Sequence, residues 1–127
     1  MPARSPEDVD RLFETALNAG DLEALMQLYE PGAALRPSPG QSVQGSEAIR
    51  AALAGFLAMK PKISLTPRLL GACGDVALVS ASWKLSGTGA DGNAVDMTGQ
   101  SAEVVRRQAD GSWRFAIDSP FGLEGNT

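Results

Sequence analysis

Residues 101–122 read SAEVVRRQADGSWRFAIDSPFG, which is two apolar runs on either side of Asp110-Gly111. An Asp-Gly pair between such runs is a strong signal for a β-hairpin with a two-residue turn. Counting back from that turn, Glu103 on the first strand faces Asp118 on the second. The hairpin therefore predicts two carboxyl groups side by side.

The face that carries these two carboxyl groups is predicted to be the inward one. In the same register Val105 faces Ala116, and Val95, Met97 and Val105 share the side of the sheet that carries the carboxyl groups. An apolar face must pack against other elements, so we expect the helices to cover it.

The chain upstream of the hairpin also alternates with a period of two. Apolar residues recur at every second position from Ala77 to Leu85, and they alternate with the polar residues Ser80, Ser82, Lys84 and Ser86. Turn residues follow at Gly74-Asp75 and at Asp91-Gly92-Asn93. The pattern predicts an antiparallel meander of four strands, at roughly 63–72, 76–88, 94–108 and 112–119.

The first half of the chain has helical periodicity. Apolar residues recur there every three or four positions, between capping residues and helix breakers. Three helices are predicted, from Ser5 to Gly20, from Asp21 to Pro31-Gly32, and from Ser46 to Pro61, with a possible short strand at 33–36. Helices that precede an antiparallel sheet indicate an α+β fold, and 127 residues indicate one domain, 1–127.

The composition excludes several kinds of site. The chain has no histidine and a single cysteine, Cys73, so Ser-His-Asp and Cys-His catalysis, histidine-ligated metals and an internal disulfide are all excluded. Any chemistry must use carboxylates, Tyr29, lysine or arginine. We expect neither a metal nor a cofactor.

Charge and hydropathy indicate a protein of the cytoplasm. The net charge of −4 repels phosphate backbones and anionic lipid, so we expect no nucleic-acid partner and no membrane partner. No apolar run is long enough to span a bilayer, and Glu7, Asp8 and Asp10 stand where a signal peptide would be basic and apolar.

The whole pattern resembles a known superfamily. The stretches AGDLEALMQLYEPGA (19–33), GSEAIRAALAGFL (45–57) and ALVSASWKLSG (77–87), followed by the hairpin at 101–122, resemble the nuclear transport factor 2-like superfamily, in particular its SnoaL-like and ketosteroid-isomerase-like branch. The resemblance implies a cone in which a curved sheet wraps a long helix and encloses an apolar pocket. It does not imply one reaction, because this fold carries many functions.

The resemblance also bears on single positions. Ketosteroid isomerases have a base after the second helix, where this chain has Arg36 and Pro37, and a protonated acid that matches Glu103. Proteins like limonene epoxide hydrolase have an Arg and an Asp where this chain has Ala81 and Trp83, and a second Asp that matches Asp118. The resemblance thus implies that Ala81, Trp83, Glu103 and Asp118 point inward.

Pocket residues follow from these placements. We expect Trp83, Tyr29, Met97, Ala81 and Arg36 to line the pocket, with Arg36 at its rim. Packing at the end of the second helix is the alternative for Tyr29, and a solvated loop charge is the alternative for Arg36. Asp118 could instead be a satisfied structural acid, and Glu103 could pair with Arg106, Arg107 or Lys84.

Two functions are consistent with such a pocket. The first is binding of an apolar small molecule, with no assigned activity. The alternative is a cofactor-independent isomerase, cyclase or lyase that acts on an apolar carbonyl compound, with Asp118 and Glu103 as tentative catalytic residues for proton transfer. The outward face of the sheet, with Leu78, Val104, Phe115 and Ile117, predicts a homodimer.

Overall fold

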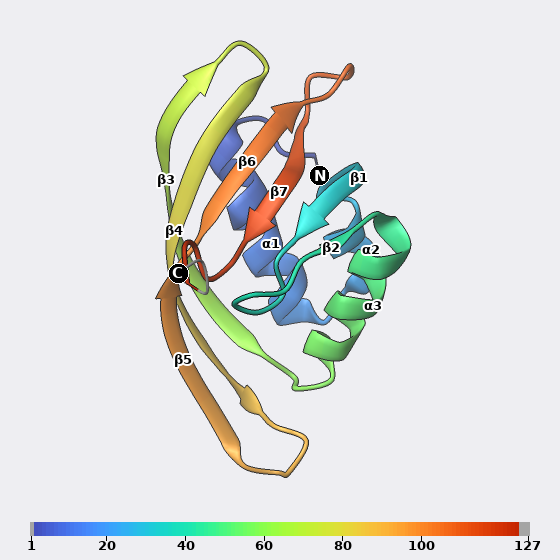
Figure 1. Ribbon diagram of the computed structural model, residues 1–127, viewed down its shortest axis with the longest axis vertical. Helices are drawn as coiled ribbons and strands as arrows, with labels where there is room; N and C mark the ends of the chain where they lie inside the picture. The colour runs from blue at the N-terminus through green and yellow to red at the C-terminus, as the bar shows by residue number, and fades with distance from the viewer. Residues whose placement is uncertain (1, 125–127) are drawn as a thin grey trace.

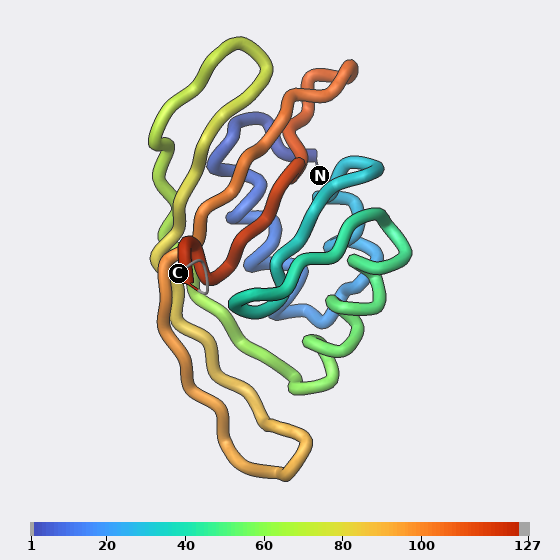
Figure 2. Tube along the Cα trace, in the orientation of Figure 1, coloured from blue at the N-terminus to red at the C-terminus, as the bar shows by residue number. Residues whose placement is uncertain are grey.

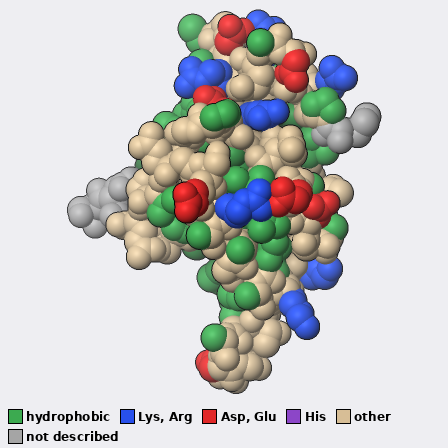
Figure 3. Space-filling model, turned by 90° about the vertical axis from the view of Figure 1, so that its right-hand side faces the viewer, with side chains coloured by type: hydrophobic (Ala, Val, Ile, Leu, Met, Phe, Trp, Pro, Cys, Tyr) green, Lys and Arg blue, Asp and Glu red, His purple; other side chains and the backbone are tan. Residues whose placement is uncertain are grey.

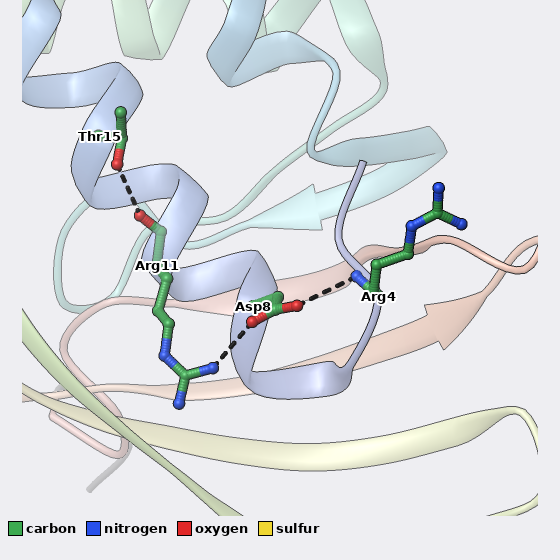
Figure 4. Close-up of polar contacts among 4 residues, drawn as sticks. All are labelled: Arg4, Asp8, Arg11 and Thr15. Atoms are coloured by element: carbon green, nitrogen blue, oxygen red, sulfur yellow. Dashed lines mark hydrogen bonds and ion pairs between the residues drawn. The ribbon is translucent and has the colours of Figure 1, made fainter. Parts of the chain in front are cut away.

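Helix α1 (Pro6–Ala19) begins and ends where the sequence predicts. In the computed structural model, which describes residues 2–124, Gly20 takes a left-handed conformation (φ 69°) and ends the helix. Ser5 stands at the N-cap without a side-chain hydrogen bond. The first turn is instead held by Asp8, which accepts hydrogen bonds from the Arg4 amide at 3.2 Å and from Arg11 Nη1 at 2.8 Å (Figure 4).

The second helix is shorter than predicted. Helix α2 (Leu22–Met26) starts at its predicted cap, where Asp21 Oδ1 accepts from the Ala24 amide at 3.0 Å. It then ends early, because Tyr29 begins strand β1 (Tyr29–Leu35) rather than completing the helix. The Leu28 carbonyl accepts from the Phe115 amide at 2.7 Å, so pairing with the last strand replaces a further helical turn.

Helix α3 (Ser46–Leu57) is close to its prediction and packs on the same core. Ile49 and Leu53 are buried, and Gly45 rather than Ser46 stands at the N-cap. The ion pair Arg50–Glu23 links α3 to α2 on the outer surface. Figure 3 views the side of the molecule that carries these helices, where basic and acidic side chains lie next to one another.

The sheet has more strands than the predicted meander. Besides β1 it contains β2 (Val43–Gln44), β3 (Lys62–Cys73), β4 (Val76–Thr88), β5 (Ala94–Gln100), β6 (Ala102–Arg107) and β7 (Trp113–Ser119). The order is β2-β1-β7-β6-β4-β3, and β5 also pairs with β4. The meander is confirmed as antiparallel, whereas β1 pairs with β7 in parallel.

The strand predicted at 94–108 is divided at Ser101. Its Oγ accepts from the Ala81 amide at 2.9 Å, and its carbonyl accepts from Ser80 Oγ at 2.6 Å. One part of β4 therefore pairs with β5 and the other with β6. The sheet curves, α1 lies across its concave side, and the β4–β5 hairpin extends beyond the rest (Figures 1 and 2).

The final hairpin confirms the predicted carboxyl pair by an unpredicted route. The Gln108 amide donates to the Ser112 carbonyl at 2.7 Å, so the loop has three residues, not two. This shift pairs Val105 with Phe115 instead of Ala116. A β-bulge at Ala116 then restores the register, and Glu103 faces Asp118 as predicted.

The bulge also corrects the predicted orientation of Phe115. This side chain is 1% exposed and lies inward, not on the outer face. Its ring packs against Tyr29 at 5.0 Å and against Phe13 at 6.1 Å between centroids. Ile117, on the other side of the bulge, faces outward as predicted and is 46% exposed.

We predict that Gly99→Ala destabilises the fold. A Cβ at this position would lie 2.6 Å from Cζ2 and 2.9 Å from Cε2 of Trp83, whose Nε1 is held by a hydrogen bond to the Pro120 carbonyl at 2.7 Å. The free energy of unfolding in urea should fall by about 1–3 kcal/mol. Gly71→Ala is the matched control, because a Cβ there meets nothing within 4 Å. Equal stability of the two variants would contradict the prediction.

Candidate functional site

A cavity of about 300 Å³ lies between the helices and the concave face of the sheet. Its walls are mostly apolar. Six aromatic side chains contribute to them, namely Phe13, Tyr29, Phe56, Trp83, Phe115 and Phe121. The polar side chains in the lining are Asp10, Tyr29, Ser101, Glu103 and Asp118, together with the Trp83 indole. The cavity thus combines an apolar body with a group of acids.

Tyr29 holds the Asp118 carboxyl inside this cavity. The Tyr29 hydroxyl donates a hydrogen bond to Asp118 Oδ2 at 2.5 Å, and both side chains are buried. Burial raises the pKa of Asp118 to about 7, even though the bond from Tyr29 lowers it; the charge of Asp10 raises it. Burial and the charge of Asp118 raise the pKa of Tyr29 well above its usual 10. Asp118 can therefore gain or lose a proton near neutral pH.

Glu103 forms a second acidic group together with Asp10 of α1. The two carboxyls interact directly, and Glu103 is 1% exposed and Asp10 5%. Burial, followed by the charge of Asp10, raises the pKa of Glu103 to about 11, and burial also raises the pKa of Asp10. We call these two residues the acid pair. Glu103 keeps its proton at neutral pH and can donate a hydrogen bond.

The alternative ion pairs for Glu103 do not form. Arg106 contacts Glu30 across the outer surface, with Nε at 2.9 Å from Oε1, and Arg107 contacts Asp75. The Glu103 and Asp10 carboxyls hydrogen-bond to each other, and the buried oxygens Glu103 Oε1 and Asp10 Oδ2 have no partner outside this pair among residues 2–124. Two buried carboxyls without a cation beside them are costly, so they indicate a site rather than a structural network.

Asp10 is the functional residue that the sequence prediction missed. It appeared only as an acidic residue near the N-terminus. The signal was available in the helical spacing, because Phe13 and Leu17 lie three and seven residues further on and share its face. An acid on the apolar stripe of an amphipathic helix predicts a buried carboxyl group.

Only some of the predicted pocket residues line the cavity. Tyr29, Trp83 and Met97 line the cavity, whereas Ala81 and Arg36 do not. Ala81 is fully buried without being part of the lining. Tyr29 reaches the cavity from a strand rather than from the predicted helix end, which places its hydroxyl against Asp118.

Arg36 instead holds the C-terminal turn. Its guanidinium donates to Ser119 Oγ at 3.0 Å, to the Gly122 carbonyl at 2.8 Å and to the Glu124 carbonyl at 2.9 Å. The same turn carries Phe121, which lines the cavity and packs edge-on against Trp83 at 5.6 Å between centroids. Arg36 therefore shapes the cavity indirectly, through Phe121.

Two further properties concern the whole of residues 2–124. None of the helices there has the length and apolarity needed to span a bilayer. No group of three or more acidic or cysteine side chains in that range is arranged to hold a metal ion.

Comparisons with known proteins identify a matching family and several structures of similar fold. Residues 9–116 match the model of a family described as the SnoaL-like domain. A search of the curated proteins finds no match. Among solved structures, a protein from Novosphingobium aromaticivorans, named provisionally as an aromatic ring hydroxylase, is 24% identical with a TM-score of 0.78, over 87% of this chain and 81% of that chain.

Two other solved structures share the predicted fold. A protein from Streptomyces avermitilis, named provisionally as a dehydratase from the NTF2-like family, is 21% identical with a TM-score of 0.72, over 87% of this chain and 88% of that chain. A ketosteroid isomerase-like protein from Erwinia carotovora atroseptica is 20% identical with a TM-score of 0.77, over 88% of each chain. At these identities the likeness is one of fold.

The pKa of Asp118 predicts how stability depends on pH. Because the folded-state pKa is raised, the folded state binds more protons than the unfolded state between about pH 4 and pH 7. Asp118 should therefore lower the free energy of unfolding as pH rises through this range, by about 1.4 kcal/mol for each pH unit. Asp118→Asn should gain stability relative to the wild type over the same range.

Urea unfolding at several pH values measures this difference. Asp96→Asn is the control, because Asp96 is an exposed acid on β5. A constant difference between Asp118→Asn and the wild type from pH 4 to pH 7 would contradict the prediction. A loss of stability that grows with pH would instead show that ionised Asp118 is a structural acceptor.

Proposed function

This chain belongs to the SnoaL-like domain family, and we propose that its cavity binds an apolar small molecule and transfers a proton next to a carbonyl group of that molecule. The observation that carries the proposal is the Asp118 carboxyl, which Tyr29 holds at the polar part of an apolar cavity with a pKa of about 7. A base with such a pKa is half ionised at physiological pH.

The proposed step needs only groups of this chain. Ionised Asp118 removes a proton from the carbon next to the carbonyl. The electron pair of the broken C–H bond forms a C=C bond, and the carbonyl π electrons move to the oxygen. Neutral Glu103 donates a hydrogen bond to that oxygen, as a protonated acid can do in an apolar site. Asp118 then returns the proton to the same carbon or to another carbon of the enolate.

The comparisons are consistent with this chemistry without assigning it. One structural neighbour is named provisionally as a dehydratase and another as ketosteroid isomerase-like, and both kinds of reaction involve proton transfer. The ketosteroid isomerase base after the second helix is missing here, since this chain has Arg36 and Pro37 there. Asp118 on β7 takes the place of that base in our proposal.

We predict that the protein speeds exchange of the α-protons of β-tetralone in heavy water, followed by proton NMR at pH 7. Asp118→Asn should lower the enzyme-dependent rate by about 100-fold or more, because it removes the base but keeps the shape. Asp96→Asn is the control and should exchange the α-protons at the wild-type rate. If the wild type binds β-tetralone but exchanges its α-protons no faster than buffer does, the catalytic proposal is refuted and the protein only binds the ketone.

The pH profile of this exchange identifies the base. The rate should rise with pH through about 7 as Asp118 ionises. Tyr29→Phe removes a hydrogen bond that lowers the pKa of Asp118, so the rising limb should move to higher pH. An unchanged limb in Tyr29→Phe would show that another group is the base.

The outer face of the sheet supports a second proposal, a homodimer. Leu78 pairs with Val104, and Val104 pairs with Ile117, so these side chains form a continuous band across β4, β6 and β7. Leu78 is 44% exposed and Ile117 46%. A second copy of the chain could cover this apolar band with its own.

Ile117→Lys tests the homodimer. Sedimentation velocity at micromolar concentration should show a dimer for the wild type and a monomer for the variant, because a charge in the centre of the interface cannot be desolvated cheaply. Lys84→Gln is the control on an exposed position of β4. A wild-type monomer of 13.2 kDa would refute the proposal.

A further inference from the structure

The cavity has a buried part and a rim of half-buried side chains. Asp118, Tyr29 and Trp83 belong to the buried part. Met97 and Phe121 also line the cavity but are only half-buried, so they belong to the rim. A ligand that reaches Asp118 must pass the rim, and a ligand too long for the buried part must push some of the rim aside.

Phe121 is the aromatic ring of the lining that the secondary structure holds least. Five of the six rings lie on helices or strands, whereas Phe121 lies in the turn that follows β7. Its ring packs edge-on against Trp83, at 5.6 Å and 82°. Trp83 is itself fixed, because its Nε1 donates to the Pro120 carbonyl and its ring lies against Gly99, where a Cβ would be 2.6 Å from Cζ2. A ligand that needs more room therefore gains it most easily from Phe121.

The turn that carries Phe121 is held by side-chain contacts and not by the sheet. The Arg36 guanidinium donates to Ser119 Oγ and to two carbonyls of the turn. Gly122 has a left-handed conformation (φ 61°), and a Cβ there would lie 2.8 Å from the Gln100 carbonyl oxygen. The turn thus folds closely against the end of β5, and these contacts decide where the Phe121 ring lies.

We propose that Phe121 sets the upper size of the ligand, and that Arg36 is a positioning residue that keeps the Phe121 ring in place. The proposal rests on the proposed function for the use of this cavity. Ligand pockets have volumes of about 300–1,000 Å³, and this cavity is at the small end of that range, so a bound molecule contacts most of its walls. The Phe121 ring then admits a ketone of two fused rings and excludes one of three. Without that ring, the third ring of the ligand can pack against Trp83 in its place.

Two ketones that differ by one ring test this size limit. Tetrahydrophenanthren-2-one is β-tetralone with one more fused benzene ring. In titration calorimetry at pH 7, we expect the wild type to bind β-tetralone at least about tenfold more tightly than the larger ketone. Phe121→Ala should raise the affinity for the larger ketone at least about tenfold. It should keep the binding of β-tetralone, which also shows that the variant is folded.

Leu123→Ala is the matched control, because Leu123 lies in the same turn and is 81% exposed. It should keep the wild-type ratio of the two affinities. If Phe121→Ala also keeps that ratio, the size limit is refuted and the proposed function stands. If β-tetralone binds but does not exchange its α-protons, the catalytic proposal fails, while the affinities still decide the size limit. If neither ketone binds to the wild type or to Phe121→Ala, both proposals fail.

Arg36→Met tests whether Arg36 acts through Phe121. The variant loses the guanidinium but keeps the backbone amide that donates to the Asp118 carbonyl at 2.9 Å. It should shift the preference towards the larger ketone, as Phe121→Ala does. In the double variant the two shifts should not add, because no ring is left to be positioned. Additive shifts, or an unchanged preference in Arg36→Met, would overturn the role of Arg36.

Discussion

The β-bulge at Ala116 is the constraint on which the rest of this structure depends. In a regular strand Phe115 and Asp118 would face opposite sides of the sheet, because side chains alternate. The extra residue lets both face the concave side while Ile117 faces outward. Phe115 then packs on Tyr29 and closes the core, and Asp118 reaches the hydroxyl of that same tyrosine. Core packing and the acidic site thus come from one local irregularity.

The cavity contains three buried acids, which lower the stability of the fold. Asp10, Glu103 and Asp118 are all buried, and burial raises the pKa of each of them. Ionisation of these carboxyls therefore destabilises the folded state, so some of them keep their protons. Groups that oppose folding are retained most often where they serve a ligand or a reaction. The apolar walls are the reason that these acids can hold protons at neutral pH.

The C-terminal turn connects the sheet to the cavity wall. Arg36 donates to three oxygens in the turn, and Trp83 donates to the Pro120 carbonyl. These bonds place Phe121 against the Trp83 ring, at the edge of the cavity. A residue expected to contact the ligand directly therefore acts by positioning an aromatic ring that no sequence pattern had indicated.

The sequence alone determined the features that depend on short-range patterns. The bounds of α1 follow from Pro6 and Gly20, and the inward face of β4 follows from strict alternation through Trp83. Tertiary structure decided the rest. Tyr29 leaves the helix because β7 offers its backbone a parallel partner, and Ala116 bulges because Phe115 and Asp118 are both accommodated in the concave side. The contact of Asp10 with Glu103 joins residues 93 positions apart, which local periodicity cannot specify.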